Sequence, residues 1–167
     1  MAYKQIRSEL EELAGRLNGT HAELDWTPLR YIHRNINRDL LARLYRGARV
    51  GMVTPLADGM NLVAKEYVAA QDPDDPGVLV LSHLAGAAED LTEALLVNPY
   101  DIEGMSDALS QALDMPLEER KRRYTACMDQ VEKTDVNVWC NSFISALEAC
   151  EAPLGWGNST MNHNPRK

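Results

Sequence analysis

The chain has 167 residues, of which 45% are hydrophobic and 25% are charged, proportions typical of a single globular domain. Its 17 basic and 25 acidic residues give a net charge of −8, which argues against a nucleic-acid-binding surface. No apolar run approaches the roughly 20 residues that span a bilayer, and no signal-peptide core is present, so we expect a cytoplasmic protein that does not enter membranes.

A helix opens the chain, and a short strand and a second helix follow. Apolar residues recur every three or four positions from Ile6 to Leu17, which predicts a first helix ending near Asn18. Residues 28–33 favour a short strand, and Asn37 is placed to cap the next helix. A doubly wound domain usually opens with a strand, so this start indicates either an edge helix or a chain that begins part-way through a domain.

The middle of the chain alternates between strands and helices. Residues 50–53, 78–81 and 94–97 are apolar runs that predict strands, and a helix is expected from about 61 to 71. The run at 78–81 is continuous, as a buried parallel strand requires. This alternation predicts an α/β fold with a parallel sheet flanked by helices.

The last third of the chain is predicted to be helical. Helices are expected at 102–113, 117–133 and 135–150, with Pro116 at a first helical position. Gly, Asn, Ser and Pro dominate after Pro153, so residues 151–167 are expected to form a disordered tail. We therefore expect one domain over residues 1–150, with a helical C-terminal extension.

The three cysteines are odd in number and widely spaced, which indicates reduced thiols without a catalytic role. The four histidines do not cluster with them at the spacing of a zinc site. We therefore expect no metal ion and no other cofactor.

The segment from Thr54 to Glu66 predicts a strand, a Pro/Gly turn and a helix start. The first turn of a helix exposes unpaired N–H groups that attract phosphate, and here residues 62–64 carry no acidic side chain that would compete. Asp58 precedes the helix and could reach groups beyond a phosphate, while Glu66 could accept hydrogen bonds from a ribose. This order suits a nucleotide-sugar, but ordinary helix capping produces the same spacing, and the residues alone leave both interpretations open.

Five contiguous segments are long enough to compare with known families. They are residues 24–32 (LDWTPLRYI), 49–71 (RVGMVTPLADGMNLVAKEYVAAQ), 76–82 (PGVLVLS), 85–91 (AGAAEDL) and 96–101 (LVNPYD). Together they closely resemble the trehalose-6-phosphate synthases, and the resemblance extends over roughly residues 3–150.

That resemblance implies a GT-B glycosyltransferase, which has two Rossmann-like domains around a cleft. The chain resembles most of the C-terminal, donor-binding domain, so residues 1–150 would be a partial nucleotide-sugar-binding domain. The family transfers glucose from a nucleotide-glucose, usually UDP-glucose, to glucose 6-phosphate with retention of configuration. The product is α,α-trehalose 6-phosphate.

The resemblance also assigns the sugar end of the donor site. Asp58, the candidate catalytic residue, would hydrogen-bond the donor glucose. The backbone of Gly59, Met60 and Asn61 would meet the outer hydroxyls of that sugar.

At the nucleotide end, the resemblance assigns the diphosphate to the backbone N–H groups of Leu62 and Val63. Glu66 would take the ribose hydroxyls. The loop around Ile36 would hold the base through backbone contacts, with Leu41 packing beneath it. Because backbone contacts read the base, UDP, GDP and ADP remain alternatives for the donor nucleotide.

Three further residues of the same region leave a structural and a functional interpretation open. Lys65 could contact phosphate or pair locally, and His83 could line the donor pocket or serve as a structural hydrogen-bonding group. Gly86 is expected to permit a tight turn or a close backbone approach.

Two parts of the family pattern have no counterpart in this chain. An Arg and a Lys that neutralise the leaving diphosphate would lie upstream of Met1, and the acceptor domain is absent. We therefore expect the chain alone to be weakly active or inactive, because such charges and acceptor positioning supply much of the rate. Glucose 6-phosphate would bind only if an acceptor domain is supplied, by a complementary N-terminal chain for example, and an unpaired sheet edge favours homo-oligomers.

Two other functions stay open. The chain could be a non-catalytic module that binds a nucleotide-sugar or pairs with synthase subunits. It could also be part of a glucosylglycerol-phosphate synthase, since the acceptor is chosen by the absent domain.

Overall fold

The computed structural model describes residues 2–134 and 136–150, which fall into two compact units. The first unit is Met1–Arg38 and the second is Asp39–Lys167. The predicted tail at 151–167 lies outside the described residues.

The first unit contains one long helix, α1 (Ala2–His21), which runs three residues past its predicted end. The strand predicted at residues 28–33 is wrong, because this stretch has no regular structure. At Leu29, a side chain supplies the main-chain hydrogen bonds that a neighbouring strand would supply. The Asn18 amide accepts a hydrogen bond from the Leu29 N–H (3.0 Å) and donates one to the Leu29 carbonyl (2.8 Å).

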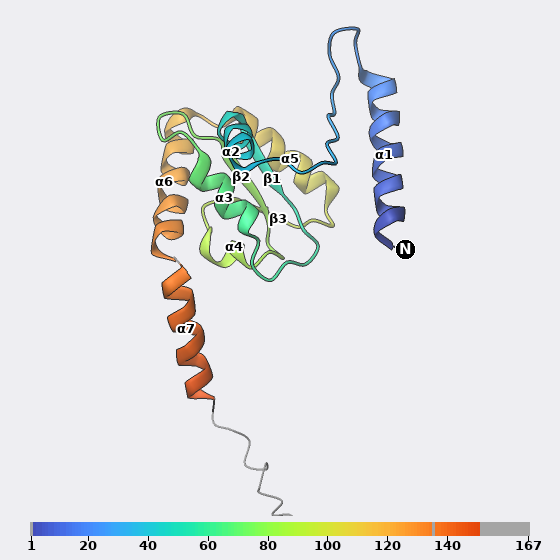
Figure 1. The fold of residues 1–167 in the computed structure, drawn as a ribbon. Helices are drawn as coiled ribbons and strands as arrows, with labels where there is room; N and C mark the ends of the chain where they lie inside the picture. Colours follow the sequence, from blue (N-terminus) through green and yellow to red (C-terminus); the bar gives the residue numbers. More distant parts are fainter. Residues whose placement is uncertain (1, 135, 151–167) are drawn as a thin grey trace, which may run out of the picture. The chain divides into compact units, whose positions relative to one another are not determined.

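The second unit is built on a three-stranded parallel sheet (Figure 1). Its strands are β1 (Val50–Val53), β2 (Val78–Ser82) and β3 (Leu95–Val97), in the order β1-β2-β3. Val50 pairs with Val78, and Val80 pairs with Leu95. The three strands predicted from the apolar runs are confirmed.

Helices cover both faces of this sheet, and the central strand β2 is therefore buried along its whole length. On one face, Leu79 and Leu81 pack with α3 (Leu62–Ala70) and with Cys127 of α6 (Leu117–Lys133). On the other face, Val78 and Val80 pack against α5 (Ile102–Asp114). The arrangement is therefore a helix–sheet–helix sandwich, and α5 and α6 are layers of it.

The remaining helices are α2 (Arg38–Gly47), α4 (Ala87–Asp90) and α7 (Val136–Ala149). The helices predicted at 102–113, 117–133 and 135–150 are confirmed to within two residues, with residue 135 itself outside the described part. The four-residue helix α4 was not predicted, since one turn is too short to show a period.

Tyr67 anchors α3 to the start of β1. Its side chain is buried, and its hydroxyl donates a hydrogen bond to the Ala48 carbonyl at 3.1 Å. Burial raises the pKa of Tyr67 to about 12, so the phenol stays protonated and keeps this bond at physiological pH.

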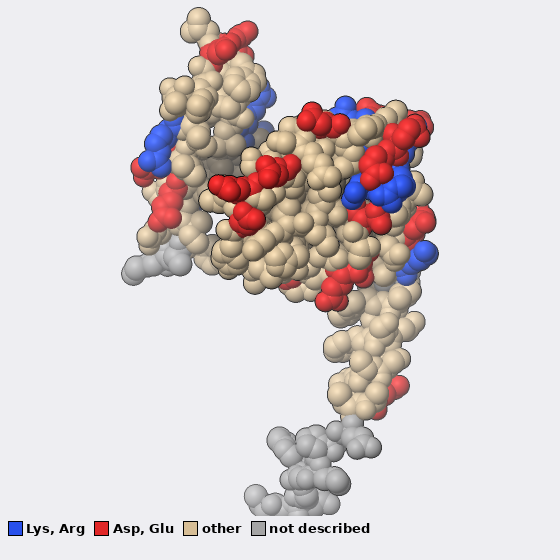
Figure 2. Space-filling model, turned by 180° about the vertical axis from the view of Figure 1, so that it is seen from behind, with Lys and Arg blue, Asp and Glu red and all other residues tan. Residues whose placement is uncertain are grey.

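The surface carries mixed charge. On the face shown in Figure 2, acidic and basic side chains are scattered and form no continuous basic stripe. None of the helices in the described residues is long and apolar enough to cross a membrane.

Candidate functional site

The candidate site lies where β1 ends and leads through residues 54–61 into α3. Ligand sites of open parallel sheets gather at this carboxyl edge of the strands. A second segment, the loop between β2 and α4, is hydrogen-bonded to it. The Asp58 N–H donates to the Leu84 carbonyl (3.3 Å), and the Gly86 N–H donates to the Asp58 carbonyl (2.8 Å). The turn is therefore held by two neighbouring strand ends.

Gly86 lets these two segments approach closely, as predicted. A Cβ atom at this position would lie 2.3 Å from the Gly59 carbonyl oxygen. Such a contact with backbone would force the two loops apart. The packing therefore requires glycine at residue 86.

The Asp58 carboxylate organises the turn around itself. Its Oδ1 accepts a hydrogen bond from the Met60 N–H (3.0 Å), and its Oδ2 accepts one from the Asn61 side chain (2.9 Å). The Met60 N–H is the main reason why the pKa of Asp58 lies below its ordinary value, so this group is a carboxylate at neutral pH. A carboxylate has about four acceptor sites, so each oxygen keeps capacity for a ligand hydroxyl.

The Met60 backbone is committed within the protein. Its N–H serves Asp58, and its carbonyl accepts a hydrogen bond from the Ala87 N–H at 2.8 Å. The Met60 side chain, by contrast, is 42% exposed. The peptide groups of Met60 thus fix the turn, and its carbonyl oxygen keeps one lone pair for a ligand hydroxyl.

Asn61 starts α3 in a conformation that the sequence analysis missed. Its backbone is left-handed (φ 67°), and it is the one described residue other than glycine with positive φ. Its side-chain oxygen caps the helix by accepting a hydrogen bond from the Ala64 N–H at 2.9 Å. Asparagine tolerates this backbone better than most residues, which is the signal that could have identified it.

This cap leaves the diphosphate candidates open. Because Asn61 binds the third N–H of the helix, the first two, those of Leu62 and Val63, have no partner inside α3. The first turn carries no acidic side chain. The helix start therefore offers two N–H groups and a positive dipole end to an anion.

Lys65 and Glu66 have different surroundings. The Lys65 ammonium lies 2.7 Å from an Asp90 carboxylate oxygen, so Lys65 pairs locally with α4. Glu66 is exposed, and its charge is the second cause, after burial, of the raised pKa of Tyr45 on α2. Tyr45 lies one turn after Leu41 on the same helix, so Glu66 and Leu41 adjoin the same part of α2.

The two base-binding candidates belong to different units. Leu41 is half-buried in the second unit, whereas Ile36 belongs to the first unit. His83 is exposed at the end of β2, and its Nδ1 lies 2.9 Å from the Val97 carbonyl oxygen. That hydrogen bond is a structural one, and it leaves Nε2 as the ring nitrogen that faces away from Val97.

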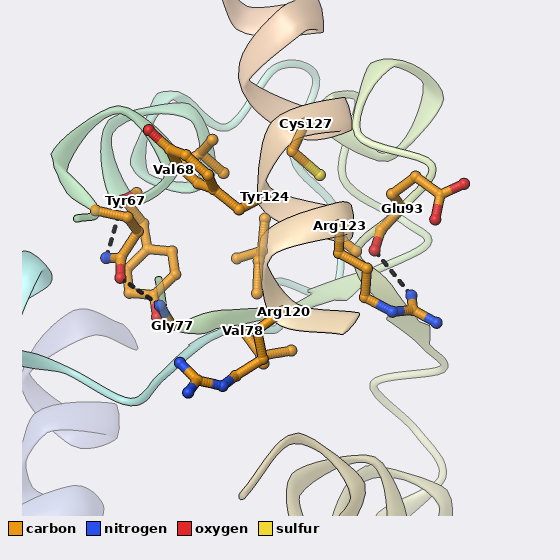
Figure 3. A pocket seen from close by; sticks show the side chains of 12 residues that line it. Tyr67, Val68, Gly77, Val78, Glu93, Arg120, Arg123, Tyr124 and Cys127 are labelled. Atoms are coloured by element: carbon orange, nitrogen blue, oxygen red, sulfur yellow. Dashed lines mark hydrogen bonds between the residues drawn. The ribbon is translucent and has the colours of Figure 1, made fainter. Parts of the chain in front are cut away.

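The cavity beneath α6 is unsuitable as a ligand site (Figure 3). Its volume of about 20 Å³ suffices for roughly one water molecule. Cys127 lines it, and burial raises the pKa of this thiol to about 11, so it is not a nucleophile at neutral pH. In residues 2–134 and 136–150, no group of three or more His, Cys, Asp or Glu is placed to hold a metal ion.

Comparison with known proteins gives the same answer from sequence and from fold. The model of glycosyltransferase family 20 matches residues 1–149. A trehalose-6-phosphate synthase from Sinorhizobium fredii (strain NBRC 101917 / NGR234) is 58% identical over 153 residues, which are 92% of this chain and 33% of that protein. The chain thus spans about a third of the length of the curated relatives it matches.

Two solved structures extend the comparison to the fold. One is an α,α-trehalose-phosphate synthase (UDP-forming) from Burkholderia xenovorans in complex with glucose-6-phosphate. It is 58% identical with a TM-score of 0.84, over 88% of this chain and 32% of that one. The other, described as trehalose-6-phosphate from E. coli bound with UDP-2-fluoro glucose, is 54% identical with a TM-score of 0.85, over 90% and 34%.

These matches confirm the expected fold class, a Rossmann-like parallel sheet flanked by helices as in a GT-B donor domain. They cover almost the whole described chain, well beyond the turn and helix of the candidate site. The chain therefore belongs to glycosyltransferase family 20, together with the trehalose-6-phosphate synthases.

Proposed function

We propose that this chain is the part of a retaining trehalose-6-phosphate synthase that binds the nucleotide-glucose donor. The observation that carries the proposal is the start of α3, where the Asn61 cap leaves two N–H groups open beside an ionised Asp58. The names of the relatives support UDP as the nucleotide, since one is UDP-forming and another was solved with UDP-2-fluoro glucose.

In this proposal the donor lies along the turn and the first two turns of α3. The Leu62 and Val63 N–H groups bind the diphosphate, and Asp58 accepts hydrogen bonds from the glucose. Glu66, exposed further along α3, takes the ribose hydroxyls, and Leu41 adjoins the base. Gly59, Met60 and Asn61 shape the sugar end, with the Met60 peptide serving to fix the turn.

The helix start also contributes to the chemistry. Transfer of glucose leaves negative charge on the diphosphate, and preorganised N–H groups stabilise that charge without reorganisation. Each such donor is typically worth on the order of 10²–10³ in rate. The transfer step itself is proposed for this chain together with the parts that correspond to the remaining two thirds of its relatives, in one polypeptide or as a complementary chain.

The free thiols of Cys127, Cys140 and Cys150 support a reducing compartment, the cytoplasm, as the site of this activity.

Calorimetric titration of the chain with UDP tests donor binding. We expect saturable binding that the Glu66→Gln variant weakens by about tenfold, the worth of one hydrogen bond to a charged group. The matched control is Glu103→Gln, an exposed carboxylate in the first turn of α5, which should bind as the unmodified chain does. No saturation by a folded chain, or equal weakening in both variants, would overturn the assignment.

A chimera extends the same pair of variants to catalysis. Residues 3–150 would replace the matching segment of the Sinorhizobium fredii synthase, and UDP release would be followed with UDP-glucose and glucose 6-phosphate. We expect an active chimera in which Glu66→Gln raises KM for UDP-glucose more than it lowers kcat. A folded chimera that binds UDP without turnover would favour the non-catalytic binding module instead.

A further inference from the structure

A second, polar cavity of about 190 Å³ lies at the amino ends of the strands, opposite the candidate donor site at their carboxyl ends. Its lining consists of the side chains of Arg46, Arg49, Asp75 and Arg120, together with the backbone at 47–48 and 76–77. Three arginines on one small cavity are unusual in a chain whose net charge is −8.

This cavity is separate from the donor site. Residues 48–49 and 76–77 directly precede β1 and β2, so the cavity lies at the amino ends of these parallel strands. The donor candidates follow the carboxyl end of β1. The four residues of β1, at roughly 3.3 Å each, put about 13 Å between the two edges.

Arg120 is held firmly at the cavity wall. Its side chain is only 6% exposed, and its Nη1 lies 2.6 Å from an Asp75 carboxylate oxygen. It also donates hydrogen bonds to the Pro76 carbonyl and, through Nε at 3.3 Å, to the Met115 carbonyl. Figure 3 shows Arg120 and Arg123 leaving α6 in opposite directions, with Arg123 turned toward Glu93. A buried guanidinium fixed in this way is preorganised for an anion.

The other two arginines are half-exposed and differ in how firmly they are held. Arg46 forms a close pair with Asp72 (2.6 Å). The Arg49 Nη1 lies 3.6 Å from an Asp75 carboxylate oxygen, which is too long for a hydrogen bond. Arg49 could therefore turn to a ligand without breaking a hydrogen bond to Asp75.

The lining residues carry a net charge of +2, from three guanidinium groups and one carboxylate, and Asp72 outside the lining pairs with one of these groups, that of Arg46. Arg120 is the main cause of the lowered pKa of Asp75, which is therefore ionised at neutral pH. A dianion would neutralise this charge, and the planar forks of arginine suit phosphate oxygens.

The volume limits the size of that anion. About 190 Å³ corresponds to roughly six water molecules, and pockets for drug-sized ligands start near 300 Å³. A whole nucleotide-sugar would extend well beyond it. We propose that this arginine cavity binds inorganic phosphate or a small phosphomonoester, independently of the donor site.

Heteronuclear NMR on the ¹⁵N-labelled chain separates the two sites in one titration. Inorganic phosphate should shift the amide signals of Gly47 and Gly77, which line the cavity, in a chain already saturated with UDP. Glycerol 3-phosphate in a parallel titration distinguishes a phosphomonoester from free phosphate. If phosphate shifts only the Leu62 and Val63 amides, the ligand belongs to the donor site and the proposal is wrong; a chain that fails to bind UDP leaves the cavity test intact.

Substitutions of opposite sign sharpen the test. Arg49→Gln should weaken phosphate binding by about tenfold, whereas Arg43→Gln, an exposed arginine of α2 outside the lining, should leave it unchanged. Asp75→Asn should strengthen binding, because it removes the carboxylate that pairs with Arg49 and Arg120 and leaves only the Asp72 pair with Arg46. Absence of saturable shifts, equal weakening by the two arginine variants, or weaker binding in Asp75→Asn while the thermal transition is retained would each overturn the proposal.

Discussion

The two proposed anion sites lie at opposite ends of the strands, and they differ in the groups that supply the positive charge. At the carboxyl edge, the positive field comes from the backbone at the start of α3, and the side chains nearby are the carboxylates Asp58 and Glu66. At the amino edge, α2 ends at Gly47, and the end of a helix is negative, so cationic side chains must supply the charge. The direction of each helix thus agrees with binding by peptide groups at the proposed donor site and by arginines at the proposed phosphate site.

The largest expected effect breaks the carboxyl edge. Gly86→Ala places a methyl group against the Gly59 carbonyl, and overpacking of this kind costs about 1–3 kcal/mol in the free energy of unfolding. Gly59→Ala is the matched control, because nothing lies within 4 Å of a Cβ added there. Urea denaturation should show a clear loss for the first variant and almost none for the second. Equal losses would mean that the two loops are not packed as described.

A smaller effect concerns the start of α3. Asn61→Ala removes the cap and forces alanine into a left-handed backbone, and the lost cap alone typically costs about 1 kcal/mol. Asn61→Gly also loses the cap but accepts the backbone, so it should be the more stable of the two in the same denaturation experiment. If glycine is no better than alanine, the left-handed conformation is not what this position requires.

The smallest effect is a pH dependence. The folded-state pKa of Asp58 lies below the ordinary value of 3.8, chiefly because of the Met60 N–H. The stability this gives is present above pH 3.8 and is lost as pH falls through the folded-state pKa, where the unfolded chain binds the proton more readily. The slope of unfolding free energy against pH below 4 should therefore be shallower in Asp58→Asn. An identical slope in both proteins would show that the turn does not hold the carboxylate.

Much of the sheet could be predicted because its strands are short apolar runs, and residues 78–81 lie in the fully buried strand. The failed strand at 28–33 shows the limit of such patterns. Its composition suits a strand, but one side chain, Asn18, takes the place of a pairing partner at Leu29. A pattern of residue types does not reveal which partner the chain will meet.

The same contrast holds for the two sites. The donor candidates for the sugar, diphosphate and ribose all lie within residues 58–66, so a turn followed by a helix start could be predicted from the sequence there. The arginine cavity is formed by three separate segments, which contribute Arg46 and Arg49, Asp75, and Arg120, and only the packing of α6 beside β2 brings them together. The left-handed Asn61 lies between these cases, since its position is visible in the sequence and its backbone angle is not.

The hydrogen bond from the Tyr67 hydroxyl to the Ala48 carbonyl links α3 to the backbone just before β1. One end of this nine-residue helix carries the Leu62 and Val63 N–H groups, and its sixth residue, Tyr67, is hydrogen-bonded to Ala48, which also lines the arginine cavity. This bond therefore holds the middle of α3 against the backbone that leads into β1.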